Sequence, residues 1–187
     1  MNEVMEKNCV NGIDLDALAE ATHAVEQDPA SGIVAFRVRT EWTGQTRSET
    51  TIDSCTLGGE RIERRHKIVA DEPYELLGTD SAPNPQELLM AAVNACMMVG
   101  YVAQAAVRGI NLATCRIEME GALDLRGFLG LDETVPNGYR QLDYVVTLEG
   151  DGTREQYAEI HEAVKATSPN FYNMNQAILM NGRLADS

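Results

Sequence analysis

Cys96 is the residue of this chain whose chemistry depends most on its surroundings. It stands near the middle of residues 81–109, "SAPNPQELLMAAVNACMMVGYVAQAAVRG", which predict a helix that is apolar almost all round. A cysteine thiolate is a nucleophile, whereas a thiol in apolar surroundings behaves as a small core residue. From the residues alone, Cys96 is either a reactive thiol or part of the core.

The predicted helix cannot activate Cys96 through its own dipole. Asn84 as N-cap, Pro85 at the first helical position and Glu87 as the capping-box residue mark its start. Cys96 is twelve residues past Asn84, about 18 Å at the rise of an α-helix, and the dipole acts within the first turn. A reactive thiolate therefore requires an arginine from another element beside the sulfur.

One face of this helix carries small and apolar residues, and we predict that this face is buried. Close approach of another helix or of a second subunit is possible there, since isologous dimers are the commonest oligomers. Gly109 is the predicted end of the helix. The residues that share the face are Leu89, Ala92, Val93, Cys96, Gly100, Ala103 and Val107.

The other cysteines and the histidines form no local metal or dithiol motif. They are scattered along the chain, with no CxxC and no CxxH spacing. We therefore expect no metal site and no cofactor. These residues are Cys9, Cys55, Cys115, His23, His66 and His161.

Composition indicates a folded protein and argues against a nucleic-acid partner. Of the 187 residues, 44% are hydrophobic and 24% charged, close to globular averages. A formal charge of −14 argues against nucleic-acid binding, which needs clustered Lys and Arg. The start "MNEVMEKNCVNG" lacks a secretory signal, and the apolar stretch 88–107 is interrupted by Asn94 and Gln104. We expect a cytoplasmic protein with reduced thiols and no membrane span.

The remaining patterns predict an α+β fold. Residues 14–27, capped by Asp14, predict an amphipathic helix, and a capping box at Thr153 and Gln156 begins another helix that ends at Ser168. Alternating or β-branched segments predict strands at 32–42, 45–55, 60–71, 113–125, 139–150 and 176–180. The economical arrangement is an antiparallel sheet with a long buried central helix and a second helix on the same side.

Four segments of the chain resemble the osmotically inducible protein C and organic hydroperoxide resistance (OsmC/Ohr) superfamily. They are "LLGTDSAPNPQELLMAAVNAC", "RGI", "EGALDLRGFLGLDETVPNGY" and "SPNF", and the resemblance runs from about residue 33 to 182. It implies an intertwined homodimer in which each long central helix packs against its mate. We accordingly divide the chain into an N-terminal helical extension, residues 1–31, and an OsmC-like domain, residues 32–187.

The resemblance also implies a reactive site. The cysteine of the central helix, here Cys96, attacks an organic hydroperoxide, and an early-strand arginine and a carboxylate hold the thiolate. We assign the arginine to Arg47, with Arg39 as the alternative. The family's carboxylate stands ten residues before the cysteine, where this chain has Gln86, so we assign the role to the adjacent Glu87.

The family's second cysteine, which resolves the sulfenic acid as a disulfide, falls on Ser168 in "TSPNF". A hydroxyl forms no disulfide, so the two-cysteine cycle cannot run in its usual form. Cys96 would then need an external thiol reductant, or Cys55 or Cys115, to clear its sulfenic acid.

Two functions follow from these residues. The first is a thiol-dependent organic hydroperoxide reductase for oxidative stress defence, whose partners are a second copy of the chain, a small organic hydroperoxide and an external thiol. The alternative is a non-catalytic ligand-binding or structural dimer on the same scaffold, with Cys96 as a core residue. Gln86 and Ser168 favour the alternative.

Overall fold

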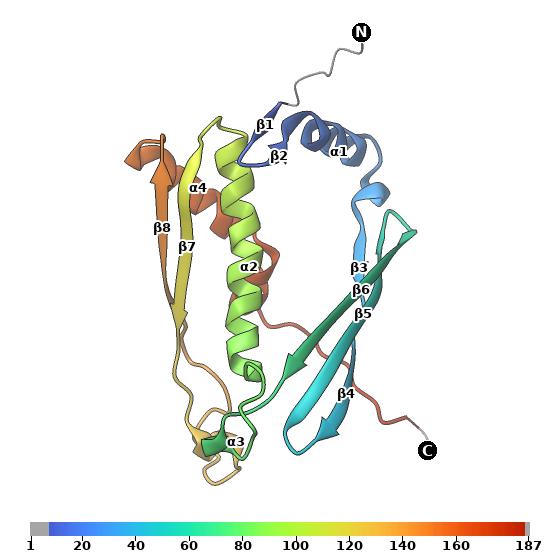
Figure 1. The fold of residues 1–187 in the computed structure, drawn as a ribbon, viewed down its shortest axis with the longest axis vertical. Coiled ribbons are helices and arrows are strands. Elements are labelled where there is room, and N and C mark those ends of the chain that lie inside the picture. The colour runs from blue at the N-terminus through green and yellow to red at the C-terminus, as the bar shows by residue number, and fades with distance from the viewer. Residues whose placement is uncertain (1–7, 186–187) are drawn as a thin grey trace. The chain divides into compact units, whose positions relative to one another are not determined.

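The computed structural model describes residues 8–185 and has a mixed α+β fold. The chain divides into two compact units, an N-terminal unit of residues 1–91 and a C-terminal unit of residues 92–187. The long helix α2 (Pro85–Ala106) contributes its first turns to one unit and the rest to the other. Figure 1 shows the order of the elements along the chain.

The N-terminal unit begins with a short hairpin and a helix. Strands β1 (Cys9–Val10) and β2 (Ile13–Asp14) pair antiparallel and lead into helix α1 (Leu15–Gln27). The Asp14 side chain accepts the Ala17 N–H at 3.1 Å and Asp28 ends the helix, as the sequence predicts. A 3₁₀ turn η1 (Pro29–Gly32) follows. The hairpin was not predicted, because its strands are too short for a periodic pattern.

An antiparallel sheet centred on β5 (Arg47–Leu57) forms the rest of this unit. β3 (Val34–Phe36) and β4 (Arg39–Gly44) pair with the two ends of β5, and β6 (Glu60–Ala70) pairs along its length. The predicted single strand 32–42 is wrong: it breaks between β3 and β4, opposite a bulge between Ile52 and Ser54. The order of strands otherwise follows the prediction.

A fully buried carboxylate, Asp71, organises the loop after β6. It accepts six hydrogen bonds, from the hydroxyls of Thr46, Thr79 and Ser81 and from the backbone N–H groups of Glu72, Thr79 and Ser81. These bonds hold the pKa of Asp71 far below its usual range, despite the opposing effect of burial. The 3₁₀ turn η2 (Tyr74–Leu76) lies within this loop.

Helix α2 begins and ends close to the predicted residues. The Asn84 Oδ1 accepts the Glu87 N–H at 2.9 Å, and the Glu87 Oε2 accepts the Asn84 N–H at 2.8 Å, which completes the capping box. Gly109, in the left-handed region at φ 69°, closes the helix. By length and composition alone α2 could cross a membrane. A core helix has the same composition, and α2 contributes several residues to the core described next.

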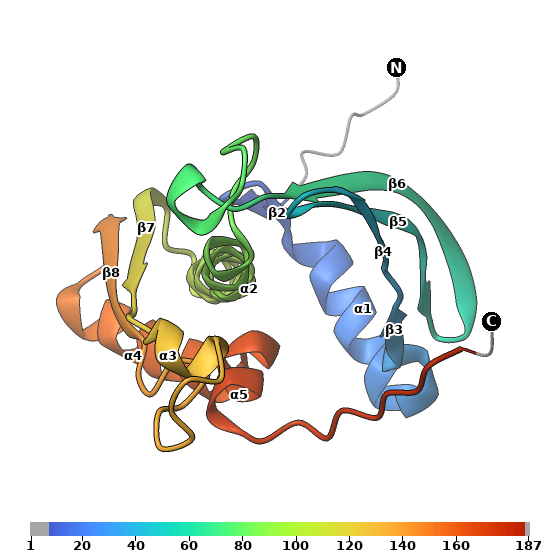
Figure 2. The same ribbon diagram turned by 90° about the horizontal axis from the view of Figure 1, so that it is seen from below.

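The core of the C-terminal unit lies between α2 and α4 (Arg154–Thr167) and one face of a hairpin. The hairpin pairs β7 (Leu112–Glu120) with β8 (Asp143–Gly150), and Figure 2 looks along α2 with this hairpin beside it. Both strands are shorter than predicted. The capping box of Thr153 and Gln156 and the end of α4 at Ser168 are confirmed. The buried residues of this core are Val93, Met97, Tyr101, Ala105, Ile110, Ile160 and Val164.

The buried stripe of α2 differs from the predicted face. It runs through Val93, Met97, Tyr101 and Ala105, whereas Val107, which we assigned to the buried face, is exposed. Because α2 is apolar on almost every side, its composition does not determine which stripe the neighbouring elements cover. Cys96 lies at the edge of the buried stripe and is partly exposed.

Two short helices of the C-terminal unit were not predicted. A short helix α3 (Leu125–Phe128) interrupts the β7–β8 connection, capped by Asp124, whose side chain accepts the Arg126 N–H. Helix α5 (Pro169–Asn175) follows α4 directly. The predicted strand 176–180 is wrong, because the residues after Asn175 form neither helix nor strand up to residue 185.

Candidate functional site

The structure brings Ser168 against the sulfur of Cys96. The Ser168 hydroxyl donates to Cys96 Sγ, with Oγ and Sγ 3.5 Å apart, although the two residues are 72 positions apart in the sequence. Ser168 is 4% exposed, whereas Cys96 is partly exposed. A buried hydroxyl therefore contacts the thiol of a residue that is itself partly exposed.

Ser168 is fixed because it ends one helix and begins the next. Its backbone N–H donates to Val164 O at 2.8 Å and so closes α4. Its hydroxyl oxygen accepts the Phe171 N–H at 3.4 Å as the N-cap of α5, with Pro169 at the first helical position. A serine that performs both tasks holds its side chain in one place.

The first turn of α5 is also attached to α2. The Asn170 Nδ2 donates to Ala92 O at 2.9 Å, and Ala92 is the residue four before Cys96 in the helix. Phe171 packs edge-on against Tyr144 of β8, with ring centroids 6.2 Å apart. The segment "SPNF" therefore joins α2, α5 and the hairpin around Cys96.

Close approach of α4 to α2 brings these groups together. A Cβ at Gly100 would lie 3.2 Å from a methyl group of the fully buried Val164, so a larger residue would require the two helices or Val164 to shift by a few tenths of an ångström. Beside Gly100 on α2, the Tyr101 hydroxyl is hydrogen-bonded to Nδ1 of His161 on α4 at 2.6 Å. Burial raises the pKa of Tyr101, so the tyrosine stays protonated. Its hydrogen bond with His161 links α2 to α4. His161 therefore has a structural partner.

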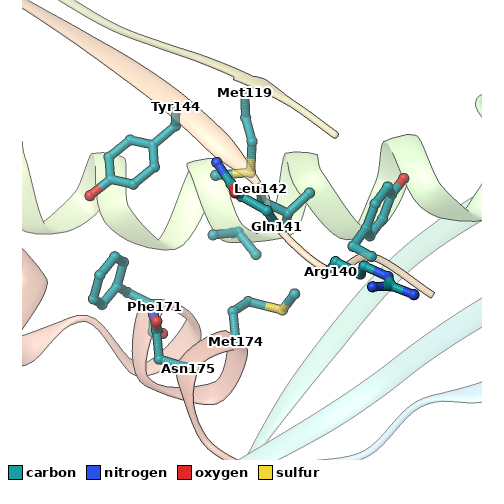
Figure 3. Close-up of a pocket in the computed structure, with 10 residues that line it drawn as sticks. Met119, Arg140, Gln141, Leu142, Tyr144, Phe171, Met174 and Asn175 are labelled. Atoms are coloured by element: carbon teal, nitrogen blue, oxygen red, sulfur yellow. The ribbon is translucent and has the colours of Figure 1, made fainter. Parts of the chain in front are cut away.

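A cavity of about 400 Å³ opens one helical turn from Cys96. Val93, three residues before Cys96, lines it, and Cys96 itself does not. Figure 3 shows Tyr144 and Phe171 at one end, Leu142 and Met174 in the middle and Arg140 at the other end. The lining combines aromatic, aliphatic and thioether groups with two amides and one cation, which suits a ligand of modest size that has an apolar part and a polar part.

The other predicted site residues lie in the N-terminal unit. The Glu87 carboxylate is engaged in the α2 capping box, and nine residues of helix, roughly 13 Å, separate it from Cys96 along α2. Arg47, at the start of β5, donates from Nη1 to Thr43 Oγ1 at 3.0 Å. Arg39, at the start of β4, is exposed and lines a shallow polar cavity. The pairing of Arg47 or Arg39 with Cys96 stays a prediction.

The remaining cysteines differ from Cys96. Cys9 is exposed, Cys55 is buried in the N-terminal unit, and Cys115 on β7 is partly buried. Burial raises the pKa of the Cys115 thiol, which favours its protonated form. No three His, Cys, Asp or Glu side chains converge on a possible metal position within residues 8–185.

Sequence reasoning missed the roles of Ser168 and Asn170. Ser168 was recognised as the end of a helix and as the absence of a second cysteine, and Asn170 was not considered. A signal was present, because Ser followed by Pro is typical of an N-cap and first helical position. That signal predicts a helix at 169 and therefore a fixed serine hydroxyl, but not its contact with Cys96.

Comparison with known proteins identifies relatives of this arrangement. The family model described as "OsmC-like protein" matches residues 78–181. An OsmC-like protein from Mycoplasma pneumoniae is 12% identical, with a TM-score of 0.59 over 75% of this chain and 86% of that chain. An OsmC-like protein of unknown function from Vibrio cholerae is 15% identical, with a TM-score of 0.55 over 73% and 91%. These two similarities show a shared fold.

Other solved structures carry names that refer to peroxides. The organic hydroperoxide resistance protein OhrB of Bacillus subtilis is 19% identical, with a TM-score of 0.47 over 74% of this chain and 88% of that chain. No curated protein sequence matches the chain.

Proposed function

This chain belongs to the OsmC-like protein family, and on that premise we propose that it is a thiol-dependent organic hydroperoxide reductase acting through Cys96. The observation that carries the proposal is the 3.5 Å contact between the Ser168 hydroxyl and Cys96 Sγ. Cys96 is partly exposed, and a hydrogen-bond donor rather than hydrocarbon alone lies beside its sulfur. Such a donor stabilises negative charge on the sulfur and so favours the thiolate, which is the form of cysteine that attacks a peroxide.

The reaction needs one hydroperoxide and two equivalents of an external thiol. The Cys96 thiolate attacks the distal peroxide oxygen, an S–O bond forms as the O–O bond breaks, and the alkoxide takes a proton and leaves as an alcohol. The product is Cys96 sulfenic acid. One thiol converts it into a mixed disulfide and water, and a second thiol releases Cys96 with a new disulfide. Ser168 makes the external thiol necessary, and we propose the reducing cytoplasm as its source.

The cavity beside Val93 supports an organic rather than an inorganic peroxide as substrate. Its walls include Met119, Leu142, Phe171 and Met174, which offer apolar contact beside the polar side chains of the lining. An alkyl or aryl group placed against these apolar side chains loses contact with water, a gain that hydrogen peroxide lacks.

We further propose that the working form is a homodimer. Val99, on the side of α2 that the core leaves uncovered, is 69% exposed, and the buried Asn94 Oδ1 has no hydrogen-bond partner within the described chain. In the N-terminal unit, Phe36 and Trp42 are 78% and 76% exposed on the sheet. A second copy that covers α2 and the sheet would bury these groups.

Turnover of cumene hydroperoxide with dithiothreitol as reductant tests the function. We expect the wild type to consume hydroperoxide in proportion to enzyme concentration, and Cys96→Ser to abolish the consumption. Cys115→Ser is the matched control, because this thiol lies in the same unit and its pKa is raised by burial. Equal rates for the wild type and Cys96→Ser would refute the proposal.

The alternative is a non-catalytic dimer in which Cys96 fills space at the edge of the core. The serine at position 168 favours it, because the usual resolving thiol is missing. In that case the wild type consumes no hydroperoxide above the rate of dithiothreitol alone, and Cys96→Ala affects stability only.

A further inference from the structure

We propose that Ser168 is a positioning residue for Cys96 and that Asn170 holds it in place. In this proposal the Ser168 hydroxyl stabilises the Cys96 thiolate, the role that the family resemblance assigns to a charged side chain. The inference rests on the proposed function for its biological meaning, but its physical content is independent of any hydroperoxide. Three features of the structure carry it: the direction of the hydrogen bond, the burial of the serine and the attachment of α5 to α2.

The Ser168 hydroxyl can donate its proton to the sulfur while its oxygen accepts another hydrogen bond. The Phe171 N–H donates to this oxygen at 3.4 Å, while Oγ lies 3.5 Å from Cys96 Sγ. A hydroxyl carries one proton, so the proton is available to the sulfur. The bond from Phe171 polarises the hydroxyl and strengthens its donation.

Burial makes this single hydrogen bond important. Ser168 is 4% exposed, so water does not compete for its hydroxyl. Hydrogen bonds to a charged group in such surroundings are stronger than those between neutral groups in water. The bond is therefore stronger when Cys96 is a thiolate than when it is a thiol, and it favours the thiolate.

Asn170 holds the serine at this distance. Its Nδ2 donates to Ala92 O at 2.9 Å, on the same side of α2 and one turn before Cys96. Because Ser168 caps the short helix α5 and Asn170 lies in its first turn, with Pro169 between them, fixing the asparagine fixes the serine. Removing the asparagine amide would let α5 move without removing the hydroxyl.

On the adjoining helices, the charged or titratable groups with assigned partners are bonded to one another. On α4, His161 is bonded to the Tyr101 hydroxyl, and Lys165 is paired with Glu162 at 3.0 Å. Between Glu87 and Arg108, α2 carries no Asp, Glu, Lys, Arg or His, and α5 carries Tyr172 as its only titratable side chain. Arg140 lines the cavity that also contacts Val93, and the hydrogen bond that the structure gives to the sulfur comes from the Ser168 hydroxyl.

The test is the pH profile of Cys96 alkylation by iodoacetamide, followed at the Cys96 peptide by mass spectrometry, with the Cys115 peptide as internal reference. For Ser168→Ala and Ser168→Gly we expect a profile moved to higher pH and alkylation at pH 7 slower by about tenfold. Glycine is included because it is nearly as good an N-cap as serine. Ser168→Thr keeps the hydroxyl and should restore the wild-type profile, and Asn170→Ala should give a smaller shift in the same direction.

Thr153→Ala is the matched control, since it removes a helix N-cap of the same unit far from Cys96 along α4. It should leave the profile unchanged. If Ser168→Ala and Ser168→Gly alkylate as the wild type does, or if Thr153→Ala shifts the profile equally, the positioning role is wrong. A shifted profile in a protein that consumes no hydroperoxide would refute the proposed function and keep the positioning role.

Discussion

Asp71 and Cys96 are both held inside the fold, and their surroundings show how a structural polar group differs from a reactive one. The two oxygens of Asp71 accept six hydrogen bonds and the side chain is fully buried. The sulfur of Cys96 receives one hydrogen bond, from Ser168, and the residue stays partly exposed. A group whose bonding capacity is filled can only hold the chain together, whereas a group with spare capacity and access can meet a substrate.

We expect the largest effect in a covalent test of the contact between Ser168 and Cys96. Because Ser168 Oγ lies 3.5 Å from Cys96 Sγ, a thiol in its place can reach disulfide distance after a small rotation. We expect the introduced thiol of Ser168→Cys to form a disulfide with Cys96 almost completely under mild oxidation, measured as two thiols lost and a cross-linked peptide.

Thr167→Cys, an exposed neighbour on α4, provides the control and should keep its thiol free. A Ser168→Cys protein that retains every thiol, or a Thr167→Cys protein that cross-links to Cys96 equally well, would contradict the geometry of the site.

The next largest effect concerns the stability of the N-terminal unit. Asp71→Asn leaves several hydroxyl and N–H donors without an acceptor, and we expect it to lower the melting temperature by about 5 °C or more at pH 7. Because the folded-state pKa of Asp71 is depressed, its contribution is complete above the ordinary aspartate pKa and declines as pH falls below about 4.

Chemical unfolding at pH 7 and at pH 3.5 measures this dependence. The difference between wild type and Asp71→Asn should be smaller at the lower pH, and Asp53→Asn, an exposed carboxylate on β5, should have almost no effect at either pH. A difference that grows on acidification would show that Asp71 is not the ionised anchor described above.

The contrast between the two groups also shows what the sequence could predict. The caps at Asp14, Asn84 and Thr153 are local signals, and the structure forms all three with the predicted partners. The Asp71 cluster was not predicted, because its donors come from separate loops and lack a common spacing. Local chemistry fixes where helices begin, whereas the cluster depends on the folded sheet.

Contacts across the chain account for the other errors. The buried stripe of α2 and the contact of Ser168 with Cys96 depend on where α4 packs, and Gly100 permits that packing without revealing its direction. The apolar run at 176–180 was predicted as a strand, yet no strand pairs with it. Pattern alone therefore located Cys96 on its helix but not the group beside its sulfur.

The smallest expected effect concerns the cavity near Cys96. Met174, which lines it, is 41% exposed, so a charge there is tolerated by the fold. We expect Met174→Glu to raise KM for cumene hydroperoxide by about tenfold, because the apolar group of the substrate meets a desolvated charge. Activity with hydrogen peroxide should be unchanged. An equal loss with both peroxides would show that the cavity does not hold the organic group.

The most direct measurement is trapping of sulfenic acid with dimedone after adding one equivalent of cumene hydroperoxide to the fully reduced protein. We predict one adduct for each chain, located at Cys96, with Cys55 and Cys115 unmodified and no adduct in Cys96→Ser. An unmodified Cys96, or an adduct that persists in Cys96→Ser, would contradict the account.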